Sequence, residues 1–336
     1  MKFNLEHDWQ GNMSTPRKKL GEKTKLHLFF ILLVIFLCTG LIGHEPWRPL
    51  ESTSISIILD IIQNNLIILP MAASEHIIIN PPLYPYVAAA FGKIFSPILS
   101  LHDAARLSNI FWISLILISL GLMTRELWGQ GFGRQAGLIF IGSVGLILNI
   151  HSLIPEIATL LGYTMSLYAL SLYFRRPFRA SLVLGFGSGI AFLSGGIAPI
   201  VIIFLSSLFL LIFNNWRNRR YFIFLGISIT IASLVVGPWV YSFHYLEPEL
   251  FISWLTTIQT SSKLLFNYHF QGILWFTWPA LPLAIWLIFR DYKLILSQRK
   301  LQIPIAFLLV LFIGVSITGN PNQTNLIPFT IPLSII

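Results

Sequence analysis

A dense group of ionisable residues lies directly behind the first apolar run of the chain, in the segment GHEPWRPLES. It contains an imidazole (His44), two carboxylates (Glu45 and Glu51) and a guanidinium (Arg48), together with a tryptophan and two prolines. Carboxylates and imidazoles can transfer protons to and from a reacting group, and a guanidinium can hold a negatively charged one. These residue types, placed where a hydrophobic segment ends, indicate either a site for polar chemistry or a membrane-interface anchor.

The anchor explanation fits part of this group. Trp47 and Arg48 are typical of the ends of membrane helices, where such residues hold the helix at the lipid–water interface. Glu51 precedes the stretch STSISIILDIIQNN, which is predicted to form an amphipathic helix with Ser52 or Thr53 near its cap. A carboxylate at a helix N-terminus is stabilised by the helix dipole. For Glu51, capping and chemistry both stay open.

Two further segments combine polar residues with local constraints. In ASEHIIINPPLYPYVAAAF, Glu75 and His76 precede a double proline, and Asn80 is held rigidly beside it. A glutamate and a histidine in a loop are more often solvated than functional. In LHDAARLSN, Asp103 and Arg106 are one helical turn apart. They form either a local ion pair, worth roughly 0.2–0.5 kcal/mol, or a site in which the arginine meets a lipid phosphate.

Two other patterns involve the ends of apolar runs. In NIHSLIPEIATL, His151 and Glu156 flank two such runs, and ionisable groups near membrane depth tend to line cavities. The stretch FLSGGIAP predicts a tight glycine turn, whose backbone N–H groups can hold an anion. The sequence has no P-loop, no H-E-x-x-H, no nucleophile elbow and no cysteine ligand set.

The composition indicates a membrane protein. Only 10% of the residues are charged and 55% are hydrophobic, whereas soluble domains carry about 25% charged residues. Several apolar runs reach the ~20 residues that a helix needs to cross the hydrocarbon layer. The net charge of +9 comes from short clusters rather than from a basic tract, so it does not indicate nucleic-acid binding. The single cysteine, Cys38, excludes a disulfide framework.

The apolar runs predict an all-α polytopic membrane protein with about ten transmembrane helices. The expected spans are 26–42, 107–123, 136–151, 155–174, 181–195, 197–213, 221–241, 273–289 and 303–318, and a tenth begins near 325. Residues 1–25 are expected to form a cytoplasmic tail and 26–336 the transmembrane domain. The last stretch, NLIPFTIPLSII, is too short to span a membrane. We therefore expect either a fragment or a protein that has lost its C-terminal part.

The distribution of basic residues predicts the topology. Residues 43–106 are expected to form one long outer loop with juxtamembrane helices. This placement leaves all but four of the 22 lysines and arginines on the cytoplasmic side. If the ambiguous segment 81–101 crossed the membrane, most of the later basic clusters would move outside. A second outer loop, 242–272, carries His244, Lys263 and His269. Polar chemistry is therefore expected on the outer face.

Several motifs, in this order and spacing, resemble those of one enzyme superfamily. The chain is similar to the C-type glycosyltransferases, specifically to glycosyltransferase family 39 and the 4-amino-4-deoxy-L-arabinose transferases, which are related to protein O-mannosyltransferases. Those proteins carry H-[DE]-P-W-[KR]-x-D-E, E-[KN]-P-P-L-Y-Y and a-a-R-L motifs. The matching residues here are His44-Glu45-Pro46-Trp47-Arg48, Glu51, Asn80-Pro81-Pro82-Leu83-Tyr84 and Ala104-Ala105-Arg106-Leu107.

The resemblance implies an inverting sugar transfer on the outer face of a bacterial-type inner membrane. The donor is a sugar on a polyprenyl-phosphate carrier, and the acceptor is a lipid, a glycan or a protein. A carboxylate orients and deprotonates the acceptor hydroxyl, and cations or a divalent metal ion hold the phosphate. Glu51 is then expected to be the catalytic carboxylate. The expected substrate-binding residues are Arg48, Glu75, His76, Asn80, Tyr84, Arg106, His244, Lys263 and His269.

Two positions depart from the family pattern. The aspartate of the D-E pair, the family's expected catalytic base, falls on Leu50, and the glutamate of E-[KN]-P-P falls on Ile79. Either Glu51, Glu75 or Asp60 replaces the missing carboxylate, or the chain binds lipid-linked sugar without transferring it. Two alternatives come from other classes of protein. One is a transporter, which would carry polar residues and broken helices within its spans, and the other is a structural membrane subunit.

Overall fold

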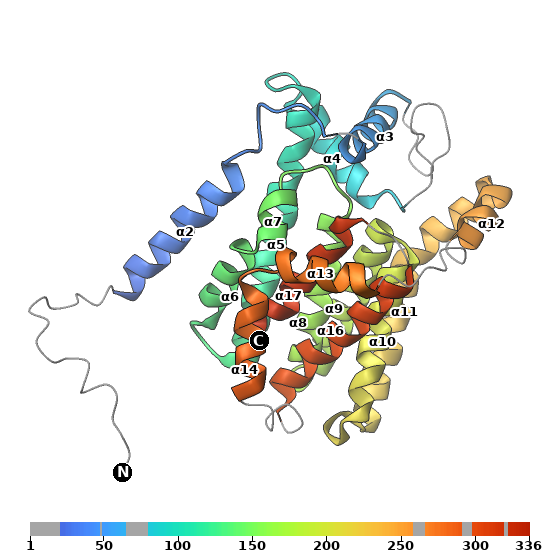
Figure 1. Cartoon of the computed structure of the whole chain (residues 1–336). Coiled ribbons are helices and arrows are strands. Elements are labelled where there is room, and N and C mark those ends of the chain that lie inside the picture. Colours follow the sequence, from blue (N-terminus) through green and yellow to red (C-terminus); the bar gives the residue numbers. More distant parts are fainter. Residues whose placement is uncertain (1–20, 48, 65–79, 258–265, 291–297, 319–321) are drawn as a thin grey trace, which may run out of the picture. The chain divides into compact units, whose positions relative to one another are not determined.

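The structure is a computed structural model of the chain (Figure 1). It describes residues 21–47, 49–64, 80–257, 266–290, 298–318 and 322–336. The chain divides into two compact units, Met1–Leu37 and Cys38–Ile336, and all helices after the first described one belong to the second unit. In the described residues all regular secondary structure is helical, which confirms the predicted all-α fold.

The helices follow one another closely along the chain. The α-helices are α2 (Glu22–Cys38), α3 (Leu50–Asn64), α4 (Leu83–Phe95), α5 (Leu101–Trp128), α6 (Phe132–Ile141), α7 (Val144–Asn149), α8 (Glu156–Leu172), α9 (Pro177–Gly195), α10 (Ile197–Phe209), α11 (Arg219–Leu246), α12 (Pro248–Thr257), α13 (Phe266–Phe276), α14 (Ala280–Arg290), α16 (Arg299–Thr318) and α17 (Thr330–Ile335). The 3₁₀ helices are η1 (Leu210–Ile212), η2 (Asn214–Trp216) and η3 (Gln323–Phe329). Helix α2 begins inside the tail that was predicted over residues 1–25.

Four described helices are long and apolar enough to cross a membrane, namely α5, α9, α11 and α16. The bent pair α13–α14 supplies a fifth crossing if its two halves form one span. Other expected spans correspond to shorter helices, such as α8 and α10. The apolar helices indicate a membrane protein, whereas the count of about ten spans stays a prediction.

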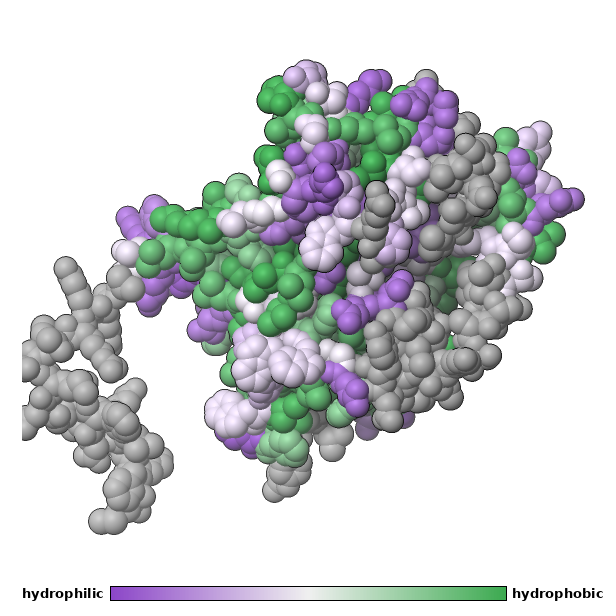
Figure 2. Space-filling view, turned by 45° about the horizontal axis from the view of Figure 1, so that its top comes forward, coloured by the Kyte–Doolittle hydropathy of each residue, from purple (hydrophilic) through white to green (hydrophobic). Residues whose placement is uncertain are grey.

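Hydrophobic side chains are exposed over much of the surface. Ile98 is 82% exposed and Trp275 is 79% exposed. Figure 2 shows broad hydrophobic areas on the visible face, with hydrophilic residues gathered in smaller groups. Large apolar surfaces of this kind are stable in contact with lipid rather than with water.

Two expected spans are interrupted. The expected span 136–151 is divided into α6 and α7 at Gly142 and Ser143. The expected span 273–289 is divided into α13 and α14, which are bent by 105° relative to each other. Pro279 lies at that break, and a proline has no backbone N–H with which to continue a helix.

Helix α8 forms the centre of the second unit, where it packs against α5, α9 and α16. Most of its side chains are buried, and three of its serine and threonine hydroxyl groups donate to backbone carbonyls of the same helix. Thr164 Oγ1 donates to Leu160 O at 2.8 Å, and Ser166 Oγ donates to Gly162 O at 2.8 Å. A Cβ added to Gly162 would lie 2.6 Å from Gly187 O of α9. The missing side chain therefore lets the two helices approach closely.

Helices α3 and α4 lie together at one end of the bundle, and α4 packs on α5 (Figure 1). Pro81 and Pro82 precede α4, and Pro85 lies in its first turn. Prolines are tolerated there because the first N–H groups of a helix have no intrahelical acceptor. The placement of residues 43–106 outside the membrane stays a prediction.

Gly162→Ala should destabilise the protein by about 1–3 kcal/mol, because the added methyl group would overlap Gly187 O and Ala191 Cβ. Gly226→Ala is the matched control, since no heavy atom lies within 4 Å of a Cβ added at that position of α11. The apparent melting temperature of the purified protein in detergent measures both effects. Equal melting temperatures of the two variants would contradict the close packing of α8 on α9.

Candidate functional site

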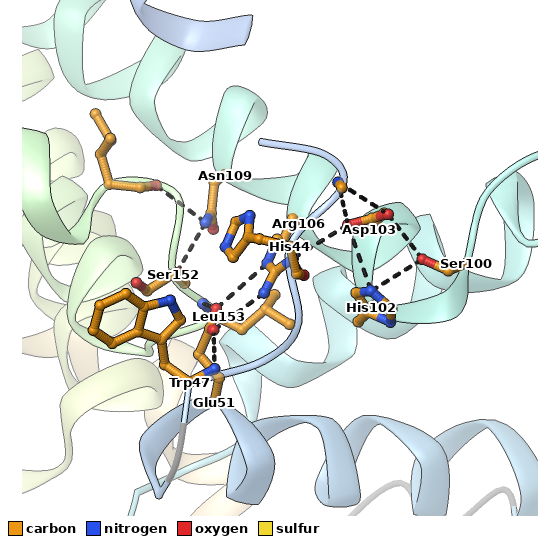
Figure 3. Close-up of polar contacts among 12 residues, drawn as sticks. His44, Trp47, Glu51, Ser100, His102, Asp103, Arg106, Asn109, Ser152 and Leu153 are labelled. Atoms are coloured by element: carbon orange, nitrogen blue, oxygen red, sulfur yellow. Dashed lines mark hydrogen bonds and ion pairs between the residues drawn. The ribbon is translucent and has the colours of Figure 1, made fainter. Parts of the chain in front are cut away.

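A buried arginine organises the end of the bundle that holds α3 and α4. Arg106, in the second turn of α5, is 0% exposed. Its Nη2 lies 3.1 Å from Glu51 Oε2, and its Nη1 lies 3.2 Å from Asp103 Oδ1. Nη1 also donates to the carbonyl oxygen of His44 at 2.7 Å. The guanidinium therefore holds two carboxylates and a backbone carbonyl at once (Figure 3).

Glu51, in the first turn of α3, is 1% exposed and accepts hydrogen bonds from three parts of the chain. Oε2 accepts from the Trp47 N–H at 2.7 Å, and Oε1 accepts from the Leu153 N–H at 2.8 Å. Arg106 Nε and Nη2 donate to Oε1 and Oε2. The bond to Trp47, four residues earlier, is the capping contact that the sequence left open. A catalytic role would require Glu51 to leave these partners.

Asp103 links the contacts around Arg106 to the segment before α3. Its Oδ1 accepts from the Gly43 N–H at 3.3 Å, and its Oδ2 accepts from Ser100 Oγ at 2.9 Å. Gly43 has a φ of 91°, a left-handed conformation that side chains disfavour. The local ion pair predicted between Asp103 and Arg106 is confirmed. Binding of a lipid phosphate by Arg106 stays a prediction.

A second buried contact joins α4, α5 and the segment before α8. Tyr84 Oη donates to Asn109 Oδ1 at 2.8 Å. Asn109 Nδ2 donates to the carbonyl oxygens of Ile150 at 3.1 Å and Ser152 at 2.9 Å. Burial raises the pKa of the Tyr84 hydroxyl, so this group stays a neutral donor. Tyr84, expected to bind substrate, is 0% exposed and links helices in this structure.

A cavity of about 480 Å³ lies among α3, the start of α4, α8, the turn between α9 and α10, α16 and η3. This volume falls within the range of roughly 300–1,000 Å³ that is common for small-molecule sites. Polar residues line it from five elements or their flanking turns, among them Thr53, Asn80, Glu156, Ser194 and Thr324. Its other walls are largely apolar, so the cavity can take a ligand that has both polar and apolar parts.

Glu156 is the one acidic residue, and there is no His, Lys or Arg, among the described residues that line the cavity. It is the first residue of α8, and its Oε1 accepts a hydrogen bond from Thr324 Oγ1 at 2.9 Å. Leu153, whose N–H is bound by Glu51, lies three residues earlier. The ion-pair network therefore fixes the segment that presents Glu156. The sequence predicts an ionisable group near a cavity at this position. No sequence pattern predicts its contact with Thr324, which is 168 residues away.

The other predicted site residues are not brought together in the described part of the chain. Asn80 lines the cavity, and its role in substrate binding stays a prediction. His244 is exposed near the end of α11, with its ring centroid 5.2 Å from that of Phe251. The residues outside the described part are Arg48, Glu75, His76 and Lys263. His269 lies in α13, but its side chain is also outside that part.

A divalent metal ion, which the resemblance implies as an alternative to protein cations, has no assigned ligands in the described residues. Within the residues that the structure describes, no group of three or more His, Cys, Asp or Glu side chains could hold a metal ion. Glu156 has a threonine as its partner, and Glu51 and Asp103 share an arginine. A guanidinium already occupies the place between these two carboxylates that a cation would take.

The fold is similar to that of ArnT from Cupriavidus metallidurans. The structure of that protein bound to undecaprenyl phosphate matches with a TM-score of 0.80 at 15% identity, over 94% of this chain and 59% of that one. Its apo state matches with a TM-score of 0.77 at 14% identity, over 93% and 58% of the two chains. This chain thus spans less than two thirds of the length of ArnT. No protein-family model and no curated protein matches it.

At this identity the likeness shows the fold alone. The chain therefore has an ArnT-like fold.

Glu51→Gln should destabilise the protein by about 3 kcal/mol, because Arg106 would stay charged and buried with one carboxylate fewer. Arg175→Gln is the matched control. It removes one member of the Arg175–Glu126 pair, whose arginine is 62% exposed, and should cost less than about 1 kcal/mol. Thermal unfolding in detergent compares the variants. If the Glu51→Gln protein melted at the same temperature as the wild type, the Glu51–Arg106 pair would not be what holds α3 in place.

Proposed function

We propose that the chain is a membrane glycosyltransferase that passes a sugar from a polyprenyl-phosphate carrier to a lipid, glycan or protein acceptor. The cavity at the start of α8 carries this proposal, because it combines one carboxylate, neutral polar groups and apolar walls. The fold supports it, since it is shared with ArnT, one structure of which is bound to undecaprenyl phosphate.

Glu156 is the residue we assign as the general base. Its carboxylate takes the proton of the acceptor hydroxyl while the hydroxyl oxygen attacks the anomeric carbon of the sugar. The bond between that carbon and the phosphate oxygen breaks, and the phosphate leaves with the bonding electron pair. Thr324 holds one oxygen of Glu156, which orients the carboxylate. Leu311 and Val315 of α16 offer an apolar wall to the lipid part of the donor.

Glu51 and Arg106 are assigned as positioning residues. Glu51 is 1% exposed, is not among the residues that line the cavity and is held by Arg106, Trp47 and Leu153. Pro49 and Thr53, on either side of it, do line the cavity. Glu51 therefore affects the shape of the cavity indirectly, because it fixes the backbone that carries Pro49 and Thr53. The sequence-based alternative, in which Glu51 is itself the base, requires the ion pair with Arg106 to open.

The proposed reaction requires a particular placement in the membrane. A polyprenyl carrier keeps its tail in lipid, so its phosphate stays at headgroup depth. The loops 43–106 and 242–272 then lie on the outer face of the inner membrane, with the N-terminus in the cytoplasm and about ten helices crossing. This is the arrangement that the distribution of basic residues indicates.

Glu156→Gln should lower sugar transfer at least about 100-fold, because a general base contributes roughly 10²–10⁴ to the rate. Glu126→Gln, a change in a carboxylate remote from the cavity, is the matched control. Mass spectrometry of lipid and glycan extracts would compare cells without the gene with cells that carry each variant. The expected signature is a mass difference of one sugar that is lost with Glu156→Gln. Full transfer by Glu156→Gln, together with loss in a folded Glu51→Gln protein, would assign the base to Glu51.

A second candidate function is binding of lipid-linked sugar without transfer. Leu50, the first residue of α3, and Ile79 are apolar where the family has carboxylates. If the chain is such a binder, Leu50→Asp should create or raise transfer activity in the same extracts, whereas Leu50→Asn should not. Transfer by the wild type that Leu50→Asp does not increase would reject this alternative.

A further inference from the structure

Ser194, near the end of α9, is a buried hydroxyl without a partner. It is 0% exposed, its Oγ has no hydrogen-bond partner, and it lines the cavity. Other buried serines of the same helix bond to the backbone: Ser188 Oγ donates to Gly185 O at 3.0 Å, and Ser181 Oγ donates to Pro177 O at 3.0 Å. An unpaired buried hydroxyl destabilises the protein. Its position at the cavity suggests that a ligand supplies the missing partner.

The N-terminus of α10 opens onto the same part of the cavity. This helix of 13 residues starts at Ile197, and Gly195 and Ala198 line the cavity. The Gly196 N–H donates to Phe192 O at 2.8 Å, so the unpaired N–H groups of the first turn begin at Ile197. The helix dipole adds a partial positive charge at this end. The turn therefore offers an anion both backbone N–H donors and the positive end of the helix dipole.

Gly196 forms the turn that precedes these donors. Its φ of 76° lies in the left-handed region, which favours glycine. A Cβ at this position would lie 3.8 Å from Pro81 Cδ and 3.9 Å from Asn80 Oδ1. Asn80 therefore stands beside the helix N-terminus; its Oδ1 is the amide atom nearest Gly196, and the Nδ2 of the same amide offers two N–H donors. We call the Ser194 hydroxyl, the α10 N-terminus and the Asn80 side chain the phosphate corner.

We propose that the phosphate corner binds the phosphoryl oxygens of the ligand. Among the described lining residues there is no lysine or arginine, so neutral donors and a helix dipole must hold the negative charge there. The inference rests on the proposed function, in which the sugar is carried on a phosphate. It also goes further, because it assigns the leaving group to a defined corner of the cavity.

The position of the proposed base fits this assignment. Thr159, one turn after Glu156 on α8, is the neighbour of the α9–α10 turn: a Cβ on Gly195 would lie 2.7 Å from Thr159 Oγ1. Glu156 and the phosphate corner are therefore on adjoining walls of one cavity. A sugar between them has its anomeric carbon next to the acceptor oxygen on one side and the phosphate oxygen on the other. As the bond between the acceptor oxygen and the anomeric carbon forms, the proton of the acceptor hydroxyl goes to Glu156. As the bond between the anomeric carbon and the phosphate oxygen breaks, its electron pair goes to the phosphate.

The test measures phosphate binding by the full chain in lipid nanodiscs. The probes are a polyprenyl phosphate, the polyprenol of the same length and inorganic phosphate. Ser194→Ala should weaken binding of the polyprenyl phosphate roughly 10- to 100-fold, because one hydrogen bond to a charged group is lost. Asn80→Asp places a like charge beside the phosphate and should weaken binding at least as much.

Ser316→Ala is the matched control. Ser316 of α16 is also 0% exposed with an unpaired Oγ, but it does not line the cavity. Both alanine variants should raise the melting temperature of the ligand-free protein, because each removes an unpaired buried hydroxyl. Only Ser194→Ala should weaken phosphate binding.

The outcomes separate this inference from the proposed function. Binding of the polyprenyl phosphate but not of the polyprenol supports both, provided that Ser194→Ala and Asn80→Asp weaken it and Ser316→Ala does not. If inorganic phosphate binds as tightly as the polyprenyl phosphate and Ser194→Ala weakens its binding, the phosphate corner is supported and the lipid carrier is rejected. Unchanged binding of the polyprenyl phosphate by both Ser194→Ala and Asn80→Asp overturns the corner and leaves the carrier in place. A wild-type chain that binds no phosphate overturns both.

Discussion

The buried contact between Arg106 and Glu51 is the interaction on which the rest of the site depends. It joins residues 55 positions apart, with 0% and 1% of the two side chains exposed. Removing one partner would leave a charge in a site that water does not reach, at a cost of roughly 3–5 kcal/mol. Glu51 also accepts hydrogen bonds from the N–H groups of Trp47 and Leu153, so each of its carboxylate oxygens has a backbone partner in addition to Arg106. Such a contact defines one arrangement of the polar segments around it.

This contact reaches the cavity through the backbone. Glu51 starts α3, which supplies Thr53 to one wall, and it binds the N–H of Leu153, just before α8 and Glu156. The shape of the cavity therefore depends on Arg106 and Glu51, two charged residues that do not line it. The group of ionisable residues that follows the first apolar run therefore has in part a structural role, because its Glu51 binds Arg106 of α5 and the Leu153 N–H before α8.

The class of fold could be predicted from the sequence because hydropathy and charge act locally. The capping contact of Glu51 and the pair of Asp103 with Arg106 were also within reach, since the partners are three or four residues apart. The contact of Glu156 with Thr324 was not, because it joins residues 168 apart through tertiary packing alone. The break between α13 and α14 was missed since the apolar run continues through it. The unpaired hydroxyl of Ser194 is visible only once its surroundings are known.

The cavity between α3, α8 and α10 is thus proposed to receive the phosphate end of a lipid-linked sugar. Electron cryo-microscopy of the full chain in nanodiscs with a polyprenyl phosphate tests this most directly. We expect phosphate density within hydrogen-bonding distance of Ser194 and Asn80, with Glu51 still paired to Arg106. An empty cavity at saturating lipid, or phosphate density bound by Arg106 after its pair with Glu51 has opened, would contradict the claim.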